Sequence, residues 1–208
     1  MTKVKICGLT NLEDAKKAED LGADFLGFIF FEKSPRVISP DAARDIIDNL
    51  HGGSEKVGLF LDHDINFVKN QTRLCRLDLI QLHGNEDPGY AAELSASGRR
   101  VIKSFKMKKD FDFSILDTYD MVDFFLFDTF KQGVPGGTGL IFDWEILKGK
   151  RFSKPIFLAG GLKPDNVKKA IEKVRPYAVD VASGVESEPG RKDYKLLEKL
   201  ITAIKRED

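Results

Sequence analysis

Two side chains in this sequence carry groups that can exchange protons with a substrate, the thiol of Cys7 and the carboxyl group of Asp128. Cys7 ends the short run "KVKIC", and Asp128 ends the apolar run "DFFLFD". A thiol and a carboxyl group with shifted pKa values can divide the roles of general base and general acid. The simpler alternatives are a small buried side chain at Cys7 and a loop cap at Asp128. Their joint placement at the ends of two runs favours catalysis.

Small residues follow two neighbouring apolar runs near the end of the chain. Gly160 and Gly161 end the run "KPIFLAGG", and Ser183 and Gly184 end "YAVDVASG". Such residues let backbone N–H groups approach an anion closely, and a helix that starts nearby adds its positive end. One Gly-Gly pair alone is best explained by a tight turn. Two small-residue loops on adjacent runs favour a phosphate-binding site.

Three further polar residues lie where they can contact a ligand. Arg36, in "EKSPRVIS", has the planar fork that suits a carboxylate, although a lone loop arginine is usually a surface cation. His83, in "QLHG", either touches a ligand or makes a structural hydrogen bond. Asp180, just before the last small-residue loop, either supports the site from behind or accepts backbone hydrogen bonds.

Short apolar runs alternate with helical patterns along the whole chain, and these elements must position the candidate residues. Several runs are apolar at consecutive positions, which is typical of parallel strands buried on both faces. The predicted strands are "KVKIC", "DFLGFIFF", "KVGLFL", "DLIQLH", "RVIKSF", "DFFLFD", "KPIFLAGG" and "YAVDVASG".

The helical patterns fill the gaps between these runs. Thr10 and Glu13 have the spacing of a capping box, and apolar residues share one face from there to Gly22. Ser39 followed by Pro40 predicts the start of a second helix. Further helices are predicted after Asp64, Asp87, Asp112, Asp143 and Pro164, and over the stretch from Leu196 to Ile204.

Eight strands, each followed by a helix, predict one (β/α)8 barrel that spans residues 1–208 as a single domain. Sites in such barrels lie at the carboxyl ends of the strands, where all the candidate residues fall. The long sixth loop, "TFKQGVPGGTG", is rich in glycine and suits a segment that wraps a ligand.

Composition sets limits on partners and location. Lys plus Arg and Asp plus Glu both number 33, so the chain has no net charge and no basic surface for nucleic acid is indicated. No apolar run approaches the roughly 18 residues that span a bilayer. The two cysteines, Cys7 and Cys75, offer neither metal-ligand spacing nor a disulfide framework. We therefore expect a cytoplasmic protein.

Several longer stretches carry a family resemblance over nearly the whole chain. They are "KICGLT", "VGLF", "QLHGNE", "FLFDTF", "PGGTGLIFDW", "FLAGGLKPDNV" and "VDVASGVESEPGRKD". In this order they resemble the phosphoribosylanthranilate isomerase family of tryptophan biosynthesis. The resemblance implies a (β/α)8 barrel with neither metal nor organic cofactor, a small-molecule substrate, and a monomer or homodimer.

The resemblance also implies a role for each candidate residue. The family converts N-(5-phosphoribosyl)anthranilate into 1-(2-carboxyphenylamino)-1-deoxyribulose 5-phosphate by an Amadori rearrangement. Cys7 would be the general base, Asp128 the general acid, and Arg36 the partner of the anthranilate carboxylate. The remaining substrate-binding residues would be His83, Asp180, Gly160, Gly161, Ser183 and Gly184, with Gly136 and Gly137 in the closing loop.

Two other functions remain open on this evidence. A dual-substrate barrel would also isomerise the histidine-pathway aminoaldose, but such barrels have a carboxylate where this chain has Cys7. A non-catalytic module that binds phosphorylated metabolites would need neither the thiol nor the carboxyl group.

Overall fold

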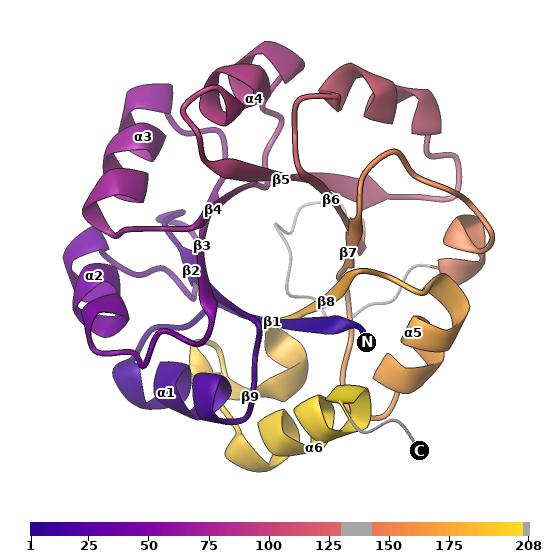
Figure 1. Ribbon diagram of the computed structural model, residues 1–208. Coiled ribbons are helices and arrows are strands. Elements are labelled where there is room, and N and C mark those ends of the chain that lie inside the picture. The colour runs from indigo at the N-terminus through magenta and orange to yellow at the C-terminus, as the bar shows by residue number, and fades with distance from the viewer. Residues whose placement is uncertain (130–142, 206–208) are drawn as a thin grey trace.

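Eight parallel strands form a closed barrel at the centre of the molecule (Figure 1). The computed structural model describes residues 1–129 and 143–205. Each strand pairs with the next along the chain, and β8 pairs with β1. This confirms the predicted barrel. The strands are β1 (Lys3–Cys7), β2 (Phe25–Ile29), β3 (Glu55–Phe60), β4 (Leu79–Leu82), β5 (Arg100–Met107), β6 (Phe124–Thr129), β7 (Ile156–Leu158) and β8 (Ala178–Val181).

Helices surround this barrel on its outer side (Figure 1). The α-helices are α1 (Leu12–Asp20), α2 (Pro40–Asp48), α3 (Ile65–Leu74), α4 (Pro88–Ser95), α5 (Val167–Val174) and α6 (Tyr194–Lys205). The helices predicted after Asp112 and Asp143 are 3-10 helices, η1 (Phe113–Tyr119) and η2 (Trp144–Leu147). No helix in the described parts of the chain is long and apolar enough to cross a membrane.

The predicted helix starts are right at Ser39 and after Asp64, Asp87, Asp112 and Asp143, and wrong at two other places. Ser39 caps α2 by accepting from the Ala42 N–H. At α1 the N-cap is Asn11, because the Thr10 hydroxyl instead donates to the carbonyl of Gly190, a residue distant in the chain. Pro164 does not open α5, which begins at Val167.

Successive side chains of a strand point to opposite faces, and this divides the core into an inner and an outer part. One face of each strand fills the barrel interior with residues such as Phe25, Leu79 and Phe157. The other face packs under the helices in the larger core cluster, which includes Leu26, Phe28 and Phe125. Cys7, Ile29 and Leu59 form a small separate cluster. Because Cys7 and Ile29 end their strands, this cluster lies at the carboxyl end of the barrel.

A short ribbon connects β8 to the last helix. After the 3-10 turn η3 (Ser183–Val185), β9 (Glu186–Glu188) and β10 (Arg191–Lys192) pair antiparallel. The ribbon lies at the same end of the barrel as the loop that follows β1, because the Gly190 carbonyl oxygen accepts a hydrogen bond from the Thr10 hydroxyl group. It therefore forms part of the wall around the carboxyl end of the barrel.

Candidate active site

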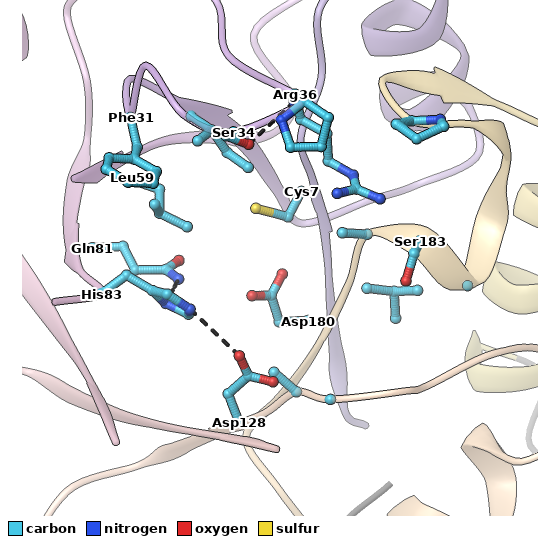
Figure 2. A pocket seen from close by; sticks show the side chains of 18 of the residues that line it. Cys7, Phe31, Ser34, Arg36, Leu59, Gln81, His83, Asp128, Asp180 and Ser183 are labelled. Atoms are coloured by element: carbon cyan, nitrogen blue, oxygen red, sulfur yellow. Dashed lines mark hydrogen bonds and ion pairs between the residues drawn. The ribbon is translucent and has the colours of Figure 1, made fainter. Parts of the chain in front are cut away.

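A cavity of about 410 Å³ opens at the carboxyl ends of the strands. Figure 2 shows the side chains that line it, with Cys7, Asp180 and Asp128 directed toward the same hollow. Every predicted site residue in the described parts of the chain lines this cavity: Cys7, Arg36, His83, Asp128, Gly160, Gly161, Asp180, Ser183 and Gly184. Gly136 and Gly137 lie outside the described residues.

The thiol of Cys7 lies beside a fully buried ammonium group. Lys5 is two residues earlier on β1 and so points to the same side, and its Nζ donates to Asp180 at 2.9 Å across the β1–β8 pairing. Gly27 on β2 makes room for both groups, because a Cβ there would lie 2.9 Å from the Cys7 sulfur and 3.0 Å from the Lys5 nitrogen. Asp180 therefore holds the amine next to the thiol.

Burial raises the pKa of Cys7, although the positive charges of Lys5 and Lys192 oppose the shift. Burial alone would lower the pKa of Lys5, but Asp180 and the Cys7 thiolate outweigh it and the pKa is raised. In the free protein the thiol is therefore protonated at neutral pH, with a cation ready to stabilise the thiolate when it forms.

The carboxyl group of Asp128 accepts hydrogen bonds from several donors. Lys106 Nζ lies 2.9 Å from Oδ2, and His83 Nε2 lies 3.4 Å from the same oxygen. The Thr129 N–H donates to Oδ1 at 2.8 Å, which is the backbone contact expected of a loop cap. Burial would raise the pKa of Asp128, but the hydrogen bond and the positive charge of Lys106 outweigh it and hold the pKa well below its ordinary value.

Hydrogen bonding fixes the tautomer of His83. Lys106 Nζ lies 2.7 Å from His83 Nε2, and an ammonium group can only donate, so Nε2 is the acceptor. The proton is then on Nδ1, which lies 3.1 Å from the Gln81 side-chain amide. Within the described part of the chain the Gln81 oxygen is buried without a partner, and turning the amide over places that oxygen on the Nδ1 proton. Burial and the Lys106 charge lower the pKa of His83, so the ring is neutral.

Arg36 makes a bidentate ion pair within the protein. Its Nε donates to both carboxylate oxygens of Glu186 at 2.9 and 3.0 Å, and its Nη2 donates at 2.6 Å. Lys192 Nζ binds the same carboxylate at 2.8 Å and the Cys7 carbonyl oxygen at 2.7 Å. Glu186 thus occupies the edge of the fork formed by Nε and Nη2, and within the described residues no hydrogen bond to Nη1 is seen.

The two small-residue loops press closely against their neighbours. Gly160 has a φ of +88°, and a Cβ there would lie 2.2 Å from the Thr129 hydroxyl oxygen. A Cβ on Gly184 would lie 1.9 Å from the Leu162 carbonyl oxygen, so the loops after β7 and β8 pack on each other. Their backbone forms one rim of the cavity, as the sequence predicts.

Four charged residues of the site were not predicted from the sequence. Lys5 shares one face of β1 with Cys7. Lys106 on β5 is the register partner of Asp128 on β6. A lysine inside an apolar strand is the available signal for both. Glu186 and Lys192 belong to the ribbon, and the stretch "ASGVESEPGRKD" contains them without indicating their partners.

Comparisons with known proteins agree with one another over the whole chain. A family model described as N-(5'phosphoribosyl)anthranilate (PRA) isomerase matches residues 4–203. A protein of Geobacter sp. (strain M21) named N-(5'-phosphoribosyl)anthranilate isomerase is 48% identical over 99% of both chains.

Solved structures give the same result. The phosphoribosyl anthranilate isomerase of Thermotoga maritima superposes with a TM-score of 0.91 at 38% identity and covers 99% of both chains. A second phosphoribosyl anthranilate isomerase, in complex with reduced 1-(o-carboxyphenylamino)-1-deoxyribulose 5-phosphate, superposes with a TM-score of 0.86 at 36% identity and also covers 99% of both chains.

Proposed function

The chain belongs to the N-(5'-phosphoribosyl)anthranilate (PRA) isomerase family, and on that premise we propose how its residues catalyse the family's reaction. The chain is an isomerase of tryptophan biosynthesis that converts phosphoribosylanthranilate into 1-(2-carboxyphenylamino)-1-deoxyribulose 5-phosphate. The observation that carries the residue assignment is a thiol and a carboxyl group that line one cavity from β1 and β6.

Two proton transfers precede the final tautomerisation. Asp128 delivers a proton to the furanose ring oxygen as the bond from that oxygen to C1 breaks, and the anthranilate nitrogen lone pair forms the C=N bond of a protonated Schiff base. Cys7, as the thiolate, then removes the proton from C2, which gives an enolamine that tautomerises to the ketose. General acid and base groups each contribute typically about 10²- to 10⁴-fold to such a rate.

Two anion-binding regions orient the sugar between these groups. The free end of the Arg36 guanidinium binds the anthranilate carboxylate, while Glu186 holds its other edge. The phosphate is bound by backbone N–H groups of the loops that contain Gly160, Gly161, Ser183 and Gly184, with Gly136 and Gly137 in a closing loop. His83 and Asp180 are positioning residues. His83 accepts from Lys106, which binds Asp128, and Asp180 binds Lys5.

The test is an assay that follows the disappearance of phosphoribosylanthranilate by fluorescence. We expect wild-type turnover, and a loss of kcat of at least about 10²-fold in Cys7→Ser and in Asp128→Asn. Cys7→Ser should keep the wild-type melting temperature within a few degrees, because it nearly conserves volume. Asp128→Asn should melt at a lower temperature but remain folded at the assay temperature, because it removes the carboxylate that pairs with Lys106. Unchanged kcat in either variant would remove that residue from its assigned role.

The same assay separates the alternatives. A dual-substrate barrel would also isomerise the histidine-pathway aminoaldose, whereas we expect no turnover of it because β1 carries a thiol in place of a carboxylate. A binding module would retain the substrate without converting it.

Location and assembly follow from the same premise. We propose a single-domain cytoplasmic enzyme without nucleic-acid partners that is a monomer or a homodimer. A solved relative from Thermotoga maritima is described as dimeric, and monomers have been generated from it. Sedimentation of the purified chain distinguishes the two states.

A further inference from the structure

We propose that Lys106 supplies, through Asp128, the proton that opens the ribose ring. This inference rests on the proposed role of Asp128 as the general acid. The mechanism proposed above gives no role to Lys106. The inference makes it a positioning residue that supplies a proton through Asp128.

The starting point is that Asp128 holds no proton in the free protein. Lys106 and Asp128 are register partners on β5 and β6, and their side chains meet at 2.9 Å. The Asp128 carboxyl group also faces the His83 ring at 3.4 Å and the Thr129 N–H at 2.8 Å. Donors directed at both oxygens stabilise the carboxylate, which agrees with its lowered pKa. A general acid in this state must first receive a proton.

Among the described residues in contact with Oδ2, Lys106 is the one that has a proton to give. His83 is neutral, and its Nε2 accepts from Lys106. Asp180, whose charge also acts on His83, is paired with Lys5, which lies beside Cys7. Lys106 therefore has both the contact and the charge that the transfer requires.

The proposed transfer balances as a relay. An N–H bond of the Lys106 ammonium breaks as an O–H bond forms at Asp128 Oδ2, and that proton moves on to the ribose ring oxygen as its bond to C1 breaks. Lys106 is left as a neutral amine and Asp128 as a carboxylate. The amine regains a proton from water, which it can reach because 31% of its side chain is exposed.

The experiment compares Lys106→Met with Lys106→Arg by steady-state kinetics on phosphoribosylanthranilate. An arginine keeps the cation beside Asp128 but does not release its proton, because its pKa exceeds 12. We expect both variants to lose at least about 10²-fold in kcat, as for the loss of a general acid, with KM within about threefold. Circular dichroism confirms that both variants are folded.

The pH profile gives a second readout that a structural role would not move. Both enzymes need the Cys7 thiolate, so that pH dependence cancels in the ratio of their kcat values. In Lys106→Met the proton must reside on Asp128 itself, so the ratio of variant to wild-type kcat should increase as the pH falls toward the ordinary carboxyl pKa of about 4. A ratio that does not change with pH would overturn the proposal.

The remaining outcomes also discriminate. Wild-type kcat in Lys106→Arg would show that the cation only orients Asp128. If the Cys7 thiol supplied the proton instead, Lys106→Met would be faster than wild type, because Asp128 would be protonated more easily. Both results overturn the relay. Asp128→Asn separates it from the proposed function: an inactive Asp128→Asn beside an active Lys106→Met rejects the relay alone, whereas an active Asp128→Asn rejects the role of Asp128.

Discussion

The thiol of Cys7 is protonated at neutral pH in the free protein, although it is proposed to act as a base. Burial raises its pKa, and Lys5 is the strongest opposing charge. The reactive form is therefore a minor species that Lys5 stabilises, and the geometry at β1 determines how much of it exists. Lys5, two positions earlier on β1, therefore controls how much of the thiolate base is present.

Alkylation of Cys7 tests this state directly. In a Cys75→Ala background, the rate of inactivation by iodoacetamide should still be rising with pH above about 8.5, the ordinary thiol pKa, because only the thiolate reacts. Lys5→Met should slow the reaction further at each pH, since it removes the stabilising charge. A rate that levels off below pH 8 would instead show a thiolate of low pKa and contradict our reading of the site.

At the scale of elements, the β9–β10 ribbon sets the position of the proposed carboxylate-binding group. Glu186 on β9 holds one edge of Arg36, and Lys192 on β10 joins that carboxylate to the Cys7 carbonyl oxygen. The Glu186 side chain is almost fully buried, so its charge is not screened by solvent. The ribbon therefore couples the proposed carboxylate site to the end of β1.

Glu186→Gln should weaken substrate binding more than turnover. Loss of a charge-assisted hydrogen bond costs about 1.5 to 3 kcal/mol, so we expect KM to rise about 10-fold or more while kcat stays within a few-fold. Glu188→Gln is the matched control, because it makes the same change on the same strand at an exposed position. Equal KM values in the two variants would show that Arg36 does not depend on Glu186.

The elements themselves were largely predictable, and their exceptions have long-range causes. Consecutive apolar residues identify all eight strands, because both faces of a barrel strand are buried. The start of α1 was misplaced because Thr10 is engaged by Gly190, which no local pattern records. Cys7, Asp128 and the glycine loops were found because each ends a strand. Lys5 and Lys106 were missed because their partners lie across strand pairs.

At the scale of the whole molecule, closure of the barrel brings the proposed phosphate loops next to the first strand. The loops after β7 and β8 and the end of β1 all line one cavity. A ligand bound there contacts segments from both halves of the chain. It should therefore stabilise the folded protein as a unit.

Thermal unfolding measures this effect. At a concentration 100 times its Kd, the reduced product analogue should add about 2.7 kcal/mol to the free energy of unfolding, which raises Tm by roughly 5–11 °C for a protein of this size. Cys7→Ser should show a similar shift, because it retains both anion-binding regions. The absence of a shift in the wild type would show that the analogue does not bind in this cavity.

The long-range contacts around Cys7 also determine when the site can form during protein synthesis. Lys5 meets Asp180 at a separation of 175 residues, and Lys192 meets the Cys7 carbonyl at 185 residues. At a translation rate of about 5–20 residues per second, Cys7 is synthesised some 10–40 s before Lys192. A nascent chain therefore carries its proposed base long before the partners that complete the site have been synthesised.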